Sequence, residues 1–242
     1  MTYLDAAYQI LREHGAPLRY EEITRIVRVA AIVGLKQVRL TGGEPLVRRG
    51  IVDLVRQIAA TPGIEDVSMT TNGTLLGAFA SDLHASGLRR VNISLDTLDP
   101  LRYAAITRGG SVHEVLAGIA AAQRAGLNPI KINCVVGPDG PGQDADAVAA
   151  YAQREGLEIR FIQQMNLACG CFSVVQGGSG GDCARCNRLR LTSDGQIRPC
   201  LFSDLSFSVR QLGVAEALAR AVAEKPSSGS TCNNRSMHSI GG

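Results

Sequence analysis

The sequence predicts an α/β fold built on a parallel β-sheet, either open or rolled into a barrel. Short β-branched runs alternate with amphipathic stretches whose apolar residues recur at helical spacing. Several of these stretches end at a glycine followed by an apolar residue, which is a common way for a helix to stop. Hydrophobic residues fill 45% of the 242 positions, enough for one full domain, or two small ones, with a sizeable core.

The repeating unit is a strand followed by a helix. Strands are expected at residues 37–40, 67–71, 91–95, 129–136 and 158–164. Helices are expected at residues 21–33, 50–60, 75–86, 112–125 and 144–155, with glycine caps at Gly34, Gly63, Gly87, Gly126 and Gly156. This alternation predicts a parallel sheet, because parallel strands need a helical crossover between them. In such folds the chemistry lies at the carboxyl ends of the strands.

The amino-acid composition of the chain changes after Met165. Residues 166–200 are rich in glycine, cysteine, serine and arginine, and the glycine-rich run at 177–181 cannot be the interior of a helix. A last helix is expected at 213–223, followed by a polar tail of the kind that is usually disordered. The chain therefore divides into an N-terminal helical segment (1–19), a barrel-forming segment (20–165) and a C-terminal segment (166–242).

Charge and hydropathy exclude several classes of protein. The net charge is only +3, and the 25 basic residues, of which three are lysines, are spread along the chain, which does not favour nucleic-acid binding. No apolar run reaches the ~18–20 residues of a membrane-spanning helix, so a membrane protein is not expected. The first residues also lack the basic start and apolar stretch of a secretory signal. A cytoplasmic protein is the expectation.

The seven cysteines carry more information than the charge. An odd number without a signal sequence argues for metal binding or redox chemistry rather than a disulfide framework. The strongest signal is Cys183-x2-Cys186-x13-Cys200, which can place three thiolates on one metal centre. Three thiolates suit an iron–sulfur cluster with one iron left open. Structural zinc is the alternative, and its fourth ligand would come from Cys171, Cys232 or His238.

Polar motifs follow three of the expected strands. The sequence Thr-Gly-Gly-Glu-Pro at 41–45 admits close approach of a ligand to the backbone, while Glu44 offers an acceptor for a cationic group; an ordinary turn is the alternative. Thr-Thr-Asn-Gly at 70–73 and Ser-Leu-Asp at 94–96, each taken alone, are better explained by helix capping than by ligand binding. Lys131, within an apolar strand, either reaches outward to water or faces an anion inside the barrel.

Taken together and in order, these segments resemble one known family. The similar stretches are residues 37–46, 68–73, 90–96, 131–136, 160–162 with Met165, 183–202 and 240–242. They are similar to the GTP 3′,8-cyclases, the radical S-adenosylmethionine (SAM) enzymes that open molybdenum cofactor (molybdopterin) biosynthesis. The resemblance covers residues 20–242 and implies an incomplete (β/α)6 barrel of the radical SAM type, with a C-terminal iron–sulfur cluster segment.

The resemblance also implies roles for individual residues. A 4Fe-4S cluster would be held by Cys183, Cys186 and Cys200, and would bind the purine through its open iron. GTP would be contacted by Arg39, Thr70, Lys131, Arg188 and Arg190, the cations facing the triphosphate. Gly43, Ser94 and Met165 would line the SAM site. The tail residues Gly241 and Gly242 would reach into the active site, against the alternative that the tail is disordered.

Two stretches depart from the family pattern. The family holds its front cluster, which cleaves SAM to a 5′-deoxyadenosyl radical, with a C-x3-C-x2-C motif upstream of the first expected helix, and the printed sequence contains no such triplet. Residues 1–22 instead resemble the opening of a winged-helix module. The connection between Met165 and Cys183 is also shorter than is usual in the family. Cys169 and Cys171 do not have the spacing of the missing motif.

Two hypotheses about function follow. In the first, the chain is a cyclase by family, an enzyme of the lyase class, and this polypeptide binds GTP and one cluster without turnover. In the second, it is a degenerate, non-catalytic iron–sulfur and nucleotide-binding module. The expected partners are GTP, a downstream enzyme of the molybdopterin pathway and a second copy of the chain in a homodimer.

Overall fold

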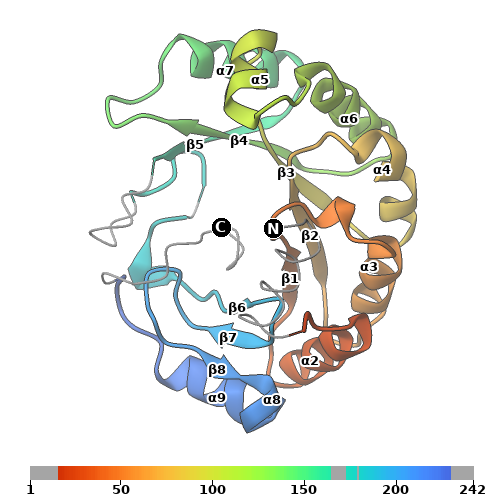
Figure 1. Cartoon of the computed structure of the whole chain (residues 1–242), viewed down its shortest axis with the longest axis vertical. Coiled ribbons are helices and arrows are strands. Elements are labelled where there is room, and N and C mark those ends of the chain that lie inside the picture. Colours follow the sequence, from red (N-terminus) through yellow and green to blue (C-terminus); the bar gives the residue numbers. More distant parts are fainter. Residues whose placement is uncertain (1–15, 165–172, 179, 230–242) are drawn as a thin grey trace, which may run out of the picture.

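A curved, five-stranded parallel sheet forms the frame of the protein. The computed structural model describes residues 16–164, 173–178 and 180–229. The strand order is β1-β2-β3-β4-β5, so each strand lies beside its predecessor in the chain. The strands are β1 (Gln37–Leu40), β2 (Asp66–Thr71), β3 (Arg90–Ser94), β4 (Ile130–Val136) and β5 (Glu158–Gln163). Figure 1 shows the sheet curving around a central region with the helices on its outer side. The expected partial-barrel architecture is confirmed.

Six α-helices and a short 3-10 turn connect these strands or flank them. They are α2 (Tyr20–Ile32), η1 (Pro45–Val47), α3 (Ile51–Ala59), α4 (Leu76–Ala85), α5 (Pro100–Thr107), α6 (Val112–Arg124) and α7 (Gln143–Arg154). All five expected helices in this region are present, and all five glycine caps adopt a positive φ, from 68° at Gly156 to 100° at Gly87. That conformation is cheap only for glycine, which explains why the helices stop there.

Helix α5 is absent from the expected elements. The Asp99 side chain accepts a hydrogen bond from the backbone N–H of Arg102 (2.8 Å), and Pro100 fills the first helical position. An Asp-Pro pair is a recognised start signal, so the signal was available in the sequence. The helix is only eight residues long, and Tyr103 is its single buried residue, so its periodicity is weak.

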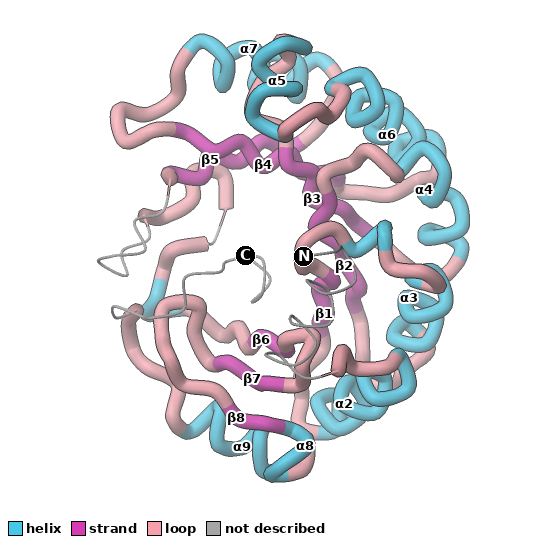
Figure 2. The backbone as a smooth tube through the Cα atoms, viewed as in Figure 1, coloured by secondary structure: helices cyan, strands magenta, loops and turns pink. Residues whose placement is uncertain are grey.

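A second, smaller sheet follows the barrel segment. Its three antiparallel strands are β6 (Arg190–Leu191), β7 (Gln196–Arg198) and β8 (Phe207–Ser208), preceded by the 3-10 turn η2 (Cys183–Arg185) and followed by α8 (Val209–Leu212) and α9 (Val214–Ala223). Helix α9 thus confirms the helix expected at residues 213–223. Figure 2 shows α8 and α9 on the outer side of the small sheet.

Two hydrophobic cores hold these parts. The larger core fills the space between the parallel sheet and its helices, with Val55, Met69, Ile93, Ile119 and Ile132 fully buried. The smaller core packs α2 against the small sheet and α9. Its members include Leu18, Ile26, Ile197, Phe207 and Leu218. The small sheet is therefore attached to the barrel through its own apolar face.

The expected N-terminal amphipathic helix and winged-helix likeness fall on residues that lie mostly outside the described part of the chain. The same holds for Met165, Cys169, Cys171, Cys232 and the tail residues Gly241 and Gly242. Among the described helices, none is both long and apolar enough to cross a lipid bilayer.

Candidate functional site

The concave face of the parallel sheet is polar, whereas its outer face is apolar. Residues in register across parallel strands point to the same side, and the register aligns Arg39 with Ser68, and Asn133 with both Ser94 and Arg160. The residues alternating with them pack into the larger core. The inner face therefore carries Gln37, Arg39, Asp66, Ser68, Thr70, Arg90, Asn92, Ser94, Lys131, Asn133, Glu158 and Arg160.

Arginines from separate elements gather on this face. Loss of hydration, together with the positive charges of Arg188, Arg160 and Arg90, lowers the pKa of Arg39 to about 10. Desolvation likewise lowers the pKa of Arg160, to which Arg90 and Arg188 also contribute. Mutual repulsion costs free energy unless an anion offsets it. This arrangement is therefore suited to binding a polyanion.

Two neighbouring ion pairs share the same face. Arg90 on β3 contacts Asp66 on β2 at 2.5 Å, and both side chains are largely buried. Lys131 on β4 contacts Glu158 on β5, and only 12% of the Lys131 side chain is exposed. Of the two readings of Lys131, the structure supports the one that points inward. The carboxylates Asp66 and Glu158 thus each hold a cation of this face.

Uncharged polar groups occupy the middle strands. The amide of Asn92 donates to the hydroxyl of Thr70 (3.3 Å), so the predicted ligand residue Thr70 lies on the inner face with a neighbour that orients it. Ser94 is exposed at the end of β3. Asn133, beside it on β4, has a buried side-chain oxygen with no hydrogen-bond partner among the described residues. A buried orphan acceptor of this kind is costly unless a ligand or water pairs with it.

The Thr-Gly-Gly-Glu-Pro loop after β1 is fastened to the loop after β2. The Glu44 carboxylate accepts hydrogen bonds from the backbone N–H of Leu46 (3.1 Å), the hydroxyl of Thr71 (2.7 Å) and the backbone N–H of Asn72 (2.7 Å). Glu44 therefore caps η1 and joins the two loops. Gly43 beside it is exposed, and the space where a Cβ would stand is open. The alternative of a purely structural turn thus accounts for Glu44, while Gly43 remains accessible.

The Ser-Leu-Asp motif does something other than capping. Asp96 accepts a hydrogen bond from the backbone N–H of Val135 on β4 (2.8 Å), and burial raises the pKa of this carboxyl. The helix start nearby is formed by Asp99, while Thr97 accepts from the N–H of Asp99 (3.0 Å). Asp96 thus links the ends of β3 and β4 rather than starting a helix.

The three predicted cluster ligands lie outside the strands of the small sheet, Cys183 and Cys186 before β6 and Cys200 after β7. Cys183 and Cys186 bracket η2, where the N–H of Cys186 donates to the carbonyl of Cys183 (3.1 Å). None of the three is in a disulfide. Cys186 and Cys200 both lie close enough to Arg190 to influence its pKa, which desolvation lowers overall. Across the described residues, however, no group of three or more His, Cys, Asp or Glu side chains has the arrangement of a metal site.

Two arginines of these sheets were not among the predicted site residues. Arg160 has a buried, unpartnered Nε, and Arg198 has two buried guanidinium nitrogens without a partner among the described residues. Both residues alternate with core residues, Ile159 and Ile197, in short strands. That alternation could have predicted that both arginine side chains point away from the cores. It could not have predicted which residues lie opposite them.

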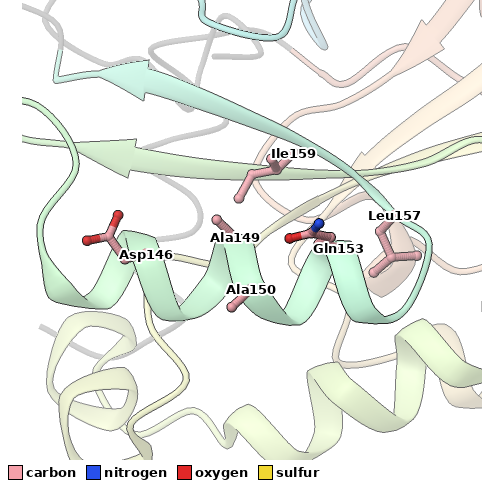
Figure 3. Close-up of a pocket in the computed structure, with 6 residues that line it drawn as sticks. All are labelled: Asp146, Ala149, Ala150, Gln153, Leu157 and Ile159. Atoms are coloured by element: carbon pink, nitrogen blue, oxygen red, sulfur yellow. The ribbon is translucent and has the colours of Figure 1, made fainter.

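A groove of about 540 Å³ lies elsewhere, between α7 and the start of β5. Figure 3 shows its lining by Asp146, Ala149, Ala150, Gln153, Leu157 and Ile159. Ile159 belongs to the core-facing side of β5. This groove is therefore on the outer side of the sheet and separate from the polar face.

Comparison with known proteins defines the class first. The radical SAM superfamily model matches residues 6–152. The solved structure of native anSMEcpe with bound AdoMet and a peptide matches 87% of this chain and 73% of its own chain, with a TM-score of 0.61. At 16% identity this likeness shows the fold alone. The fold and the family model together make this a radical SAM protein.

Sequence relatives narrow the class. The GTP 3′,8-cyclase of Moorella thermoacetica is 39% identical over 289 residues, covering 96% of this chain and 90% of the relative. That of Thermodesulfovibrio yellowstonii is 35% identical, with 96% and 89% covered. The chain therefore belongs to the GTP 3′,8-cyclase family. Because 96% of 242 residues is fewer than 289 aligned positions, the Moorella relative has residues within the matched span that this chain lacks.

Proposed function

We propose that this chain binds GTP on the polar inner face, with its triphosphate among the arginines. The observation that carries the proposal is the convergence of Arg39 on β1, Arg160 on β5 and Arg188 in the loop between η2 and β6. Desolvation, with the charges of Arg188 and Arg160, lowers the pKa of Arg39. A triphosphate would offset this repulsion, and guanidinium groups bind phosphate oxygens in pairs. Thr70, Lys131 and Arg190 complete the ligand set suggested by the family.

The three C-terminal cysteines are the proposed ligands of one 4Fe-4S cluster. Cys183, Cys186 and Cys200 are thiols outside any disulfide, and Cys186 and Cys200 share Arg190 as a neighbour, which suits thiolate ligands beside a cation. When bound, the cluster would supply an open iron for the purine. Arg188 and Arg190, which follow Cys186 in the chain, would orient the phosphates next to it.

The SAM site would lie at the carboxyl ends of β1 and β3. Accessible Gly43 and exposed Ser94 support this location, and Met165 would be the third residue. Because the printed sequence has no C-x3-C-x2-C triplet, we expect the 242-residue polypeptide to bind GTP and one cluster without turnover. A non-catalytic nucleotide-binding module is the alternative function, and it retains the same ligand residues.

Anaerobic reconstitution tests both parts of the proposal. The purified chain would be supplied with iron, sulfide, reductant, SAM and GTP. We expect about four irons per chain, GTP binding by calorimetry, and no 5′-deoxyadenosine; about eight irons would reveal a second cluster. Formation of 5′-deoxyadenosine would contradict the absence of turnover. A zinc content instead of iron would overturn the cluster assignment.

Cysteine variants test the location of the cluster. Cys183→Ser and Cys200→Ser should each lower bound iron, whereas Cys134→Ala, a substitution in the buried core of β4, should leave the iron content unchanged.

The division into segments 1–19, 20–165 and 166–242 belongs to the same proposal, as do a homodimer and transfer of the product to a downstream molybdopterin-pathway enzyme. Sedimentation of the purified chain distinguishes a dimer from a monomer.

A further inference from the structure

Arg198 lies in strand β7 of the small sheet, and the packing of that sheet does not explain why an arginine stands there. In the antiparallel pair of β6 and β7, Arg198 is opposite Arg190, and Leu191 is opposite Ile197. Leu191 and Ile197 belong to the smaller core with Phe207. Since neighbouring residues of a strand point to opposite faces, Arg190 and Arg198 lie together on the face turned away from that core.

Two of the three guanidinium nitrogens of Arg198 are buried without the partners that burial demands. Its Nε and Nη1 are inaccessible to solvent, and neither has a hydrogen-bond partner within the described part of the chain. A charged donor that loses water without gaining an acceptor destabilises the fold. A protein that retains such a group gains from it in another state, most simply when an anion is bound.

The neighbourhood favours an anion from outside the chain. Arg190, the register partner of Arg198, has its pKa lowered by desolvation and by the charge of Arg188. On the polar inner face of the large sheet, Asp66 and Glu158 already pair with Arg90 and Lys131. An added arginine in this cationic region needs an additional negative group.

We propose that Arg198 is a further phosphate-binding residue, which extends the arginine set from β6 to β7 and binds the oligophosphate of the nucleotide. This inference rests on the proposed GTP site. The ligand chemistry is a nucleoside triphosphate, because its row of phosphate oxygens offers paired acceptors to more guanidinium groups than a single phosphate does. Arg198 would contact phosphate oxygens and take no part in bond making or breaking.

The test compares Arg198→Met, which keeps the length of the side chain and removes its donors, with Arg198→Lys, which keeps the charge. Exposed Arg124 on α6, substituted by Met, is the matched control. Binding of GTP, guanosine and inorganic triphosphate to the reconstituted protein would be measured by calorimetry. We expect Arg198→Met to weaken GTP and triphosphate about 10-fold or more, Arg198→Lys to weaken them less, and guanosine binding to stay unchanged.

A second readout separates binding from a structural role. Without ligand, Arg198→Met should unfold at the same temperature as the wild type or a higher one, because an unpaired buried charge has been removed. A lower Tm, or equal weakening of guanosine and GTP, would mean that Arg198 supports the fold and not the phosphates. Equal GTP affinity of wild type and Arg198→Met would overturn the inference while leaving the proposed function intact.

The remaining outcome concerns the proposed function. If the wild type binds no GTP, that function fails. Triphosphate binding that Arg198→Met abolishes would then still support an oligophosphate site at Arg198, and its absence would overturn that site too.

Discussion

Lys131 and Glu158 form an ion pair across the neighbouring strands β4 and β5, in direct register on the polar face. The lysine is 12% exposed and the glutamate 50% exposed, so the lysine is the more enclosed partner. The residue expected to contact GTP is therefore already neutralised by the chain itself. A triphosphate bound at the proposed site would compete with Glu158 for the same ammonium group.

Removing that competition should tighten GTP binding. Glu158→Gln leaves the size of the side chain unchanged and frees Lys131, so we expect GTP affinity to rise about 3- to 10-fold, the scale of a partly exposed charge pair. Calorimetry at two salt concentrations measures this gain, which should shrink as salt screens the charges. Glu65→Gln, which breaks an exposed ion pair with Lys36, is the control. An unchanged or weaker affinity in Glu158→Gln would show that the pair stabilises the site instead.

Glu44 should contribute to stability. Its carboxylate accepts three hydrogen bonds from the chain, two of them from backbone N–H groups. Glu44→Gln replaces one acceptor oxygen by an NH₂ group, so we expect a loss of about 1–2 kcal/mol and a Tm lower by about 2–6 °C. Calorimetric melting of the protein checks this, with Glu65→Gln again as the control. A Tm equal to that of the wild type would rule out the fastening role.

Lys225 should hold the two cysteine-bearing segments together. Its ammonium donates to the carbonyl of Arg188 (2.8 Å) and to the carbonyl of Pro199 (2.5 Å), the residue before Cys200. Lys225→Met removes both bonds, so we expect faster hydrogen exchange over residues 186–200 and about 2- to 10-fold faster loss of iron to a chelator. Lys36→Met, on the exposed surface, should change neither. Identical exchange in Lys225→Met would contradict this role.

Thiol reactivity should differ sharply between Cys134 and Cys183. Burial, with the charges of Asp96 and Asp144, raises the pKa of Cys134 to about 12, whereas Cys183 is exposed. A raised pKa keeps the thiol neutral until the pH approaches that value, so at pH 8 only about one Cys134 in ten thousand is a thiolate. Iodoacetamide should therefore label Cys183 in the metal-free native protein and Cys134 only after unfolding. Mass spectrometry of the peptides measures this, and early labelling of Cys134 would refute it.

Local patterns determined the elements of this fold. The glycine stops at Gly34, Gly87 and Gly126 and the β-branched runs predict helices and strands close to the observed ends, because capping and periodicity act over a few residues. The order of the motifs also determined the family. Helix α5 was not predicted, although Asp99-Pro100 is a helix start signal. Tyr103 is the single buried residue of this helix, so it has no clear apolar periodicity.

Only the tertiary structure decided which residues meet. The alternation in β4 shows that Lys131 differs from its neighbours, but Glu158 becomes its partner through a strand register set by side-chain packing over the whole sheet. The same applies to Glu44, two of whose three donors lie 27 and 28 residues further along. Arg198 reads as an ordinary surface arginine until the pairing of β6 with β7 places it beside Arg190. The sequence by itself determined which polar and charged residues the sheets carry. Long-range strand pairing and burial decided which of them have partners among the described residues and which do not.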